Sequence, residues 1–305
     1  MAIGGATMGT RWRVTVAARP PLPPALAPAV AAMLDGIVAE MSQWEPNSAL
    51  SRFNRAPAGR WLPVPARLHE VAAAGLAVAA ASGGAFDPTH GALADLWGFG
   101  AVPPACFPPA ADAIAAARAA GGWRRLEVDR HARRLRQPGG LRLDLSGIAK
   151  GYAVDRLAAL VRAAGIEDAL VEIGGEFAGF GIKPGGEPWW VELEAPAEVG
   201  VAPLRLALHG LSVATSGDYR RFHDAGGSRL GHTIDPRTGR PAANGLVSVS
   251  VVHPSCMRAD AWATALTVLG MDAGAALAAR EGLAARLLAA DGAEHLTPAM
   301  QAMRD

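Results

Sequence analysis

The 305-residue chain has few cysteines and almost no net charge, and both shortages exclude classes of protein. Its two cysteines, Cys106 and Cys256, cannot form a disulfide framework and are too few for a zinc site. We expect Cys256 to be a small buried hydrophobic residue rather than a nucleophile. A formal net charge of +1, with no run of basic residues, provides no field for binding nucleic acid.

Long hydrophobic runs are also missing. The longest apolar stretches, such as residues 71–81, are alanine-rich and shorter than the roughly 20 residues needed to span a bilayer. The first residues lack the basic start, apolar stretch and cleavage site of a secretory leader. No transmembrane segment is expected. Two locations stay open, namely a cytoplasmic protein as encoded and a periplasmic protein that has lost a leader.

Half of the residues are hydrophobic, which is enough for one large core or two smaller ones. Short strands alternate with helices, and Gly174-Gly175 between two strand-like runs indicates a β-hairpin. Consecutive strands joined by tight turns, with helices between them, predict an α+β fold with mixed or antiparallel sheets. No proline- or serine-rich linker appears, so residues 1–305 are expected to form one unit, possibly of two intertwined α+β subdomains.

The expected helices run from a proline-rich turn at 20–28 to about residue 42, and over 66–82, 110–120 and 259–269. The expected strands cover 11–17, 169–173, 177–182, 189–194, 204–209 and 246–252, with a meander of strands around residues 125, 133 and 142.

The most informative segment is DLSGIAKGYAVD, residues 144–155. A strand-like run at 141–145 ends at Asp144, and a Ser-Gly corner leads into a helix with Lys150 in its first turn. Exposed amides at a helix start attract anions, and a lysine there adds a point charge for phosphate. Asp144 and the carbonyl at Gly147 offer the hard oxygens that magnesium binds. The segment indicates a nucleotide-diphosphate site; a simple strand-to-helix turn with a solvated lysine remains the alternative.

A second group of oxygen atoms is expected on the helix near the C-terminus. Asp260 and Thr264 are four residues apart, so they share one helix face and can converge on one ion. A carboxylate, a hydroxyl and a carbonyl form a hard ligand set suited to magnesium. The alternative is an acid favoured only by the helix dipole.

A third group surrounds a strong turn, DPRTG at 235–239. Asp235 and Thr238 are expected to fold back onto backbone amides and so to be structural. His232, at the strand end before the turn, is the better candidate for a general base or a phosphate contact. The loop at 213–219 carries hydroxyls and a glycine, which alone is weak evidence for ligand binding.

Together and in this order, the motifs of the chain resemble those of the ApbE family, the FAD:protein FMN transferases. The resemblance covers Thr7 to about Leu269. Its motifs are TMGT at 7–10, MSQWEPNSALSRFN at 41–54, GAFDPT at 84–89 with LWGF at 96–99, the segment 144–155, VEIGG at 171–175, ATSGDY at 214–219, HTIDPRTG at 232–239 and ADAWAT at 259–264.

The resemblance implies a T-fold-like α+β architecture that binds FAD and magnesium. It implies transfer of FMN from FAD to a threonine or serine hydroxyl of an acceptor protein, with release of AMP. FAD pyrophosphatase activity and non-enzymatic flavin binding are the alternatives. The residues that it places against FAD, with Lys150 near the phosphates, are Met8, Trp44, Ala85, Phe86, Asp87, Asp144, Lys150 and His232.

The implied magnesium ligands are the Gly147 carbonyl, Asp260 and Thr264. Trp44 stands where the family usually has tyrosine, and its indole can stack on a flavin ring at least as well. His232 is the expected base for the acceptor hydroxyl, with metal-bound water as the rival.

Overall fold

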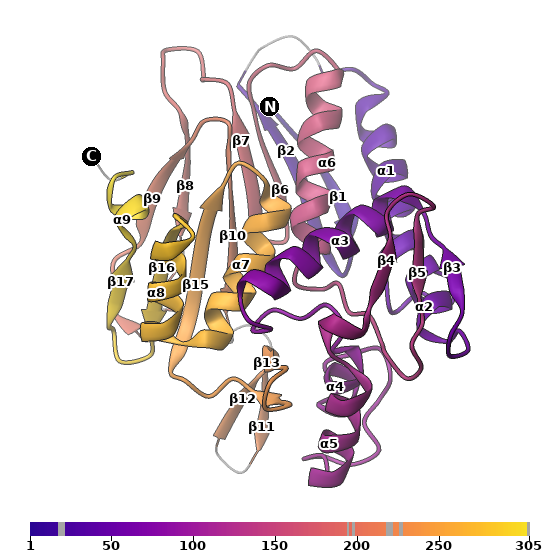
Figure 1. Cartoon of the computed structure of the whole chain (residues 1–305). Helices are drawn as coiled ribbons and strands as arrows, with labels where there is room; N and C mark the ends of the chain where they lie inside the picture. Colours follow the sequence, from indigo (N-terminus) through magenta and orange to yellow (C-terminus); the bar gives the residue numbers. More distant parts are fainter. Residues whose placement is uncertain (18–21, 194, 197–198, 218–221, 226–227, 304–305) are drawn as a thin grey trace.

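The computed structural model describes residues 1–17, 22–193, 195–196, 199–217, 222–225 and 228–303. Its centre is a sheet of eight strands in which every neighbouring pair is antiparallel (Figure 1). The strand order is β1 (Ala2–Thr7), β2 (Thr10–Val16), β6 (Ala169–Ile173), β7 (Glu176–Phe180), β10 (Leu211–Gly217), β15 (Leu246–His253), β16 (Ala284–Ala289) and β17 (Glu294–Leu296).

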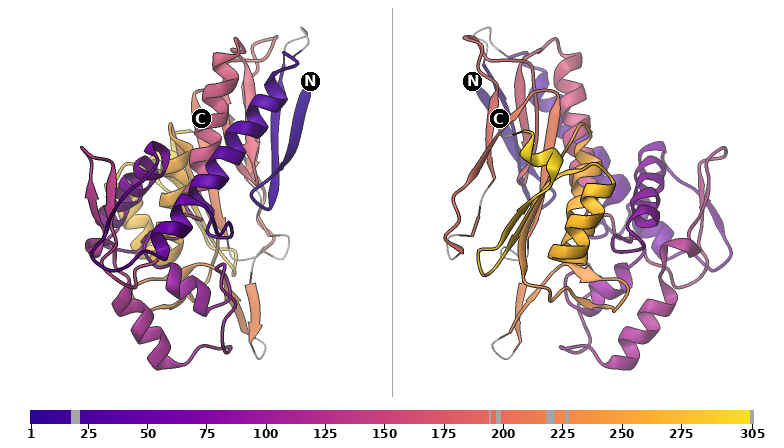
Figure 2. Two further views of the ribbon diagram at one scale, coloured as in Figure 1. Left: turned by 90° about the vertical axis from the view of Figure 1, so that its right-hand side faces the viewer. Right: turned by 60° about the vertical axis from the view of Figure 1, so that its left-hand side comes forward.

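Helices cover one face of this sheet, and a hairpin covers the other (Figure 2). The helices are α1 (Leu26–Met41), α6 (Ala149–Ala163), α7 (Cys256–Leu269) and α8 (Met271–Arg280), with α3 (Ala66–Ala81) packed against α1 and α7. The hairpin consists of β8 (Trp189–Leu193) and β9 (Leu204–Leu208), and α9 (Pro298–Gln301) packs beside β16. No helix in the described part of the chain is both long and apolar enough to cross a bilayer.

Smaller elements form the remaining parts (Figure 1). One group is a three-stranded sheet of β3 (Trp61–Pro63), β5 (Arg134–Arg136) and β4 (Glu127–Asp129), preceded by α2 (Ala49–Asn54) and by the short helix η1 (Trp123–Arg125). The other contains α4 (Gly91–Leu96), α5 (Ala111–Ala120), and the hairpins β11 (Phe222–Ala225) with β12 (Ser228–Gly231) and β13 (Ile234–Asp235) with β14 (Arg240–Pro241).

A small apolar cluster joins α4 and α5 to the β13–β14 turn. Trp97, Phe99 and Ile234 are buried together there, and Trp97 Nε1 donates a hydrogen bond to the Gly239 carbonyl at 2.8 Å. This contact links segments more than a hundred residues apart, and it positions the chain on either side of His232.

The predicted α+β class with antiparallel sheets is confirmed, as are the five predicted helices, including the one that carries Lys150. The Gly174-Gly175 hairpin is confirmed too, and both glycines have the positive φ of a tight turn, 63° and 102°. Helix α7 begins earlier than predicted because the Ser255 side chain caps it, accepting a hydrogen bond from Arg258 N.

Two strand predictions are wrong. The run at 141–145 forms only an isolated bridge, between Arg142 and His90. The third strand of the predicted meander is β3, which pairs with β5, and not the segment around Arg142. In both places the pairing partner comes from a segment that is distant in sequence. The local alternation of apolar and polar residues does not show which segment that partner is.

Candidate active site

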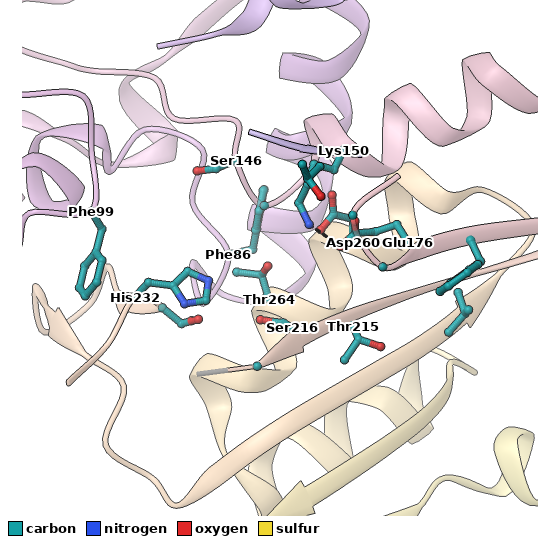
Figure 3. Close-up of a pocket in the computed structure, with 18 of the residues that line it drawn as sticks. Phe86, Phe99, Ser146, Lys150, Glu176, Thr215, Ser216, His232, Asp260 and Thr264 are labelled. Atoms are coloured by element: carbon teal, nitrogen blue, oxygen red, sulfur yellow. Dashed lines mark hydrogen bonds and ion pairs between the residues drawn. The ribbon is translucent and has the colours of Figure 1, made fainter. Parts of the chain in front are cut away.

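A cavity of about 600 Å³ lies at one end of the large sheet, where several chain segments converge. Figure 3 places Lys150, Glu176 and Asp260 at one end of it, Phe99 and His232 at the other, and Phe86 and Thr264 between them. The segments that line it are the start of β2, the loop around residues 86–99, residues 144–150, the β6–β7 turn, the end of β10, residues 232–234 and one face of α7.

The close contact between α6 and α7 brings the charged residues together. A Cβ atom on Gly151 would lie 2.3 Å from the Cys256 carbonyl oxygen, so only glycine permits this approach. The Gly151 N–H donates to Asp260 Oδ2 at 2.9 Å. Asp155 on α6 also accepts hydrogen bonds from the amides of Cys256 and Met257, the first residues of α7. The two helix starts are therefore held as one unit.

Lys150 forms an ion pair with Glu176, the first residue of β7. The Glu176 side chain is 2% exposed, and its Oε2 is buried without a hydrogen-bond partner among the described residues. Burial raises the pKa of Glu176 to about 7, although the charge of Lys150 opposes that rise. Burial lowers the pKa of Lys150, but the negative charges of Glu176 and Asp260 outweigh it and raise that pKa. The ammonium group is thus kept charged inside the cavity.

The raised pKa of Glu176 predicts how stability depends on pH. Between its ordinary value of 4.5 and about 7, the folded protein keeps a proton that the unfolded chain has lost. This contribution is therefore complete below pH 4.5 and is lost as pH rises toward the raised pKa. Glu176→Gln cannot titrate and should lack this component.

The measurement is urea unfolding of both proteins from about pH 5 to about pH 7, without FAD or metal. The wild-type free energy of unfolding minus that of the variant should fall across this range. A constant difference would contradict the assignment.

The oxygen atoms predicted to bind magnesium lie together. Asp260 is 7% exposed and lines the cavity with Thr264, one turn further along α7. A Cβ on Gly147 would be 2.9 Å from Thr264 Oγ1, so the Ser-Gly corner abuts this hydroxyl. Burial raises the pKa of Asp260, while Lys150 opposes that rise.

These donors fit a hard cation. A carboxylate, a hydroxyl and a backbone carbonyl offer only oxygen ligands, as magnesium prefers. The described residues contain no cluster of three or more His, Cys, Asp and Glu side chains that could hold a metal ion.

Of the residues expected to contact FAD around position 86, one lines the cavity. Phe86 does so, whereas Ala85 and Asp87 are buried and lie outside the lining. The Asp87 carboxylate accepts hydrogen bonds from Thr89 and from the Trp123 amide, so it holds the turn that presents Phe86. Asp144 lines the cavity and accepts a hydrogen bond from Ser146 N at 2.9 Å.

Met8 and Trp44 also lie outside the cavity lining. Met8 forms the tip of the β1–β2 turn with an unusual positive φ of 48°, two residues before Thr10, which does line the cavity. Trp44 lies in the loop between α1 and α2 with 51% of its surface exposed.

His232 lies at the end of the cavity that is remote from Lys150, with its ring edge-on to Phe99 at 6.3 Å between centroids. The turn that follows is structural, as predicted: Asp235 accepts hydrogen bonds from Arg237, and its carbonyl accepts one from the Gly239 amide at 2.7 Å. The motif residues Asp218 and Tyr219 lie outside the described residues.

The lining residues that sequence reasoning missed include Glu176, Phe99 and Arg11. Glu176 directly follows the Gly174-Gly175 turn. An acid at the start of a strand, next to a glycine pair, could have indicated that this residue belongs to the site. Phe99 and Arg11 reach the cavity only through tertiary packing. Cys256 is buried, and burial raises the pKa of its thiol well above its ordinary value, which agrees with a structural role.

Comparison with known proteins decides the family. The model of the ApbE family matches residues 8–287. The chain belongs to the ApbE family. It is 37% identical to the FAD:protein FMN transferase of Klebsiella pneumoniae over 295 residues, which is 95% of this chain and 84% of that protein. The FAD:protein FMN transferase of Salmonella typhimurium is 36% identical over 94% of this chain and 84% of its own length.

Solved ApbE structures have the same fold. The apo flavinyl transferase ApbE of Pseudomonas stutzeri superposes with a TM-score of 0.91 at 38% identity, covering 100% of this chain and 96% of that one. The flavin transferase ApbE of Vibrio cholerae gives a TM-score of 0.90 at 32% identity, covering 99% and 98%. The predicted family and the predicted enzyme class, a transferase, are confirmed.

Proposed function

We propose that this ApbE protein transfers FMN from FAD to a threonine or serine hydroxyl of an acceptor protein, with magnesium bound and AMP released. The observation that carries the proposal is one cavity with a charged lysine at one end, a hard oxygen set beside it and a histidine at the other. Relatives that share most of the chain's length carry the name FAD:protein FMN transferase, which supports this choice of substrate.

The reaction breaks one bond of the FAD pyrophosphate. The acceptor oxygen bonds to the phosphorus next to the flavin, the bond from that phosphorus to the AMP oxygen breaks, and AMP leaves with the electron pair. The hydroxyl proton passes to His232. Phosphoryl transfers of this kind depend on positioning and on neutralising charge.

Each residue contributes to one of these requirements. Lys150 offers its ammonium to the pyrophosphate, and Glu176 holds that ammonium in the cavity. Asp260, Thr264 and the Gly147 carbonyl are the groups that would hold magnesium, which neutralises pyrophosphate charge and improves AMP as a leaving group.

The test is incubation of the protein with FAD and magnesium, with and without proteins from an extract of its own cells. A flavin-fluorescent protein band after denaturing electrophoresis supports the transferase. Release of FMN and AMP at the same rate without acceptor, and with no labelled band, would show a pyrophosphatase instead. Bound FAD that remains intact under both conditions would show a flavin-binding protein.

Trp44 provides a separate prediction. If its indole stacks on the flavin ring, the contact contributes roughly 0.5–1.5 kcal/mol beyond burial, so Trp44→Ala should weaken FAD binding about tenfold. Flavin fluorescence in the complex should rise at the same time because the quenching indole is gone. The measurement is a fluorescence titration with FAD.

Trp190→Ala is the matched control, since Trp190 is similarly exposed at 46% and lies outside the cavity lining. This control should bind FAD like the wild type. Equal quenching of flavin in the Trp44 variant and in the wild type would place the ring elsewhere.

A further inference from the structure

Strand β10 is paired along only part of one side. It pairs with β15 from Ser212 to Gly217, but with β7 only from Leu211 to Val213. Among the described residues, β7 pairs with no residue of β10 beyond Val213. In an antiparallel strand the N–H and C=O groups of alternate residues point to the same neighbour. The second half of β10 therefore presents an open hydrogen-bonding edge.

The β6–β7 turn creates this edge. Gly174 and Gly175 turn the chain sharply where β10 continues, so the line of β7 ends at the turn. A Cβ on Gly174 would lie 2.9 Å from Thr10 Cγ2, so the turn also abuts the start of β2. The space beyond the turn, along the direction of β7, therefore borders β10.

The open edge lies inside the catalytic cavity. Thr215, Ser216 and Gly217 line the cavity that also contains Lys150 and His232 (Figure 3). These three residues are half-buried, although β10 is a central strand. Unpaired backbone groups of a buried strand are unfavourable unless a partner or water satisfies them, and they form a template for another strand.

We propose that the acceptor protein enters the cavity as an extended segment and pairs with β10 at Thr215–Gly217, in line with β7 beyond the Gly174-Gly175 turn. This inference rests on the proposed transferase function. A polypeptide fits because its alternating N–H and C=O groups match those of the open edge, as in other cases of strand addition. The dinucleotide offers no such ladder, and the proposed reaction needs a polypeptide hydroxyl in this cavity.

Strand addition also explains how one hydroxyl could be presented without a deep side-chain pocket. Successive side chains of a strand point to opposite faces, so pairing sets which face the reactive residue occupies. Each backbone hydrogen bond contributes little net free energy, so a short ladder gives weak binding but a defined register.

The test uses a library of peptides of about nine residues, the length of a single strand, with one central threonine and randomised flanks. The enzyme, FAD and magnesium are added, and labelled peptides are identified by flavin fluorescence and mass. The best substrate is then resynthesised with a single N-methyl group at each position in turn. Because N-methylation removes one N–H, only positions that face β10 should be sensitive.

The expected result alternates along the peptide. Every second position near the threonine should lose kcat/KM by about tenfold or more, and the positions between should change less than about threefold. The insensitive positions serve as matched controls for the bulk of the methyl group. An equal effect of N-methylation at all positions would overturn the inference and would indicate that the peptide is recognised through its side chains.

The same experiment separates the two proposals. If proteins of the cell extract become flavinylated and no library peptide does, the transferase stands and strand addition falls. Release of FMN and AMP without labelling of any peptide or protein would instead overturn the transferase proposal, and the inference with it.

Discussion

Asp260→Ala should abolish FMN transfer. The variant removes the one carboxylate among the proposed magnesium ligands, and a metal that neutralises phosphate charge is worth several kcal/mol in the transition state. The expected loss in kcat is about 10³-fold or more, since each 1.36 kcal/mol corresponds to tenfold. The measurement is the initial rate of acceptor flavinylation at saturating FAD, together with its magnesium dependence.

The structure adds a cost in stability. Asp260 is buried, and it accepts the Gly151 N–H. Its loss leaves that buried donor unsatisfied, at about 1–3 kcal/mol. Asp260→Asn can still accept this hydrogen bond, so it should keep more stability and FAD affinity than the alanine variant while its turnover remains low.

A matched control is Asp272→Ala, which removes an exposed acid from the first turn of α8, outside the cavity lining. That variant should retain wild-type rates. If Asp260→Ala shows unchanged activity with an ordinary magnesium dependence, the ligand assignment is wrong.

His232→Ala should slow transfer by about 10² to 10⁴ while FAD still binds, which is the usual contribution of a general base. An imidazole accepts a proton only in its neutral form, so wild-type kcat should rise with pH through one inflection. The variant should lose that inflection, and added imidazole should restore part of the rate. The measurement is the pH profile of kcat for both proteins.

His295→Ala is the control, because His295 is exposed on β17 and lies outside the cavity lining. It should have the wild-type profile. Retention of the inflection in the His232 variant would identify another titrating group, with metal-bound water as the rival base. In that case the loss of His232 should appear in FAD affinity and not in turnover.

Much of the part of the cavity around Lys150 and Asp260 could be predicted from the sequence. The spacing of Asp260 and Thr264 on one helix face, and the position of Lys150 in the first turn of α6, are local properties. Both placements follow from periodicity. The burial of Asp260 does not, because it depends on how closely α6 approaches α7 at Gly151.

Other features depend on contacts between distant segments. The Asp87 carboxylate accepts a hydrogen bond from the Trp123 amide, 36 residues away. Its structural role therefore cannot be predicted from the GAFDPT motif alone. Glu176 gains its role from an ion pair across 26 residues. The open edge of β10 is a property of the whole sheet, since it depends on where β7 ends and β15 continues.

The contact between α6 and α7 at Gly151 limits how the enzyme can admit its substrate. With the Cys256 carbonyl in the place where a side chain would begin, these helices have no room to slide past one another. The Asp155 hydrogen bonds to the start of α7 resist their separation as well. The wall that carries Lys150 and Asp260 is therefore fixed, so any movement that admits a substrate would have to involve other parts of the cavity lining.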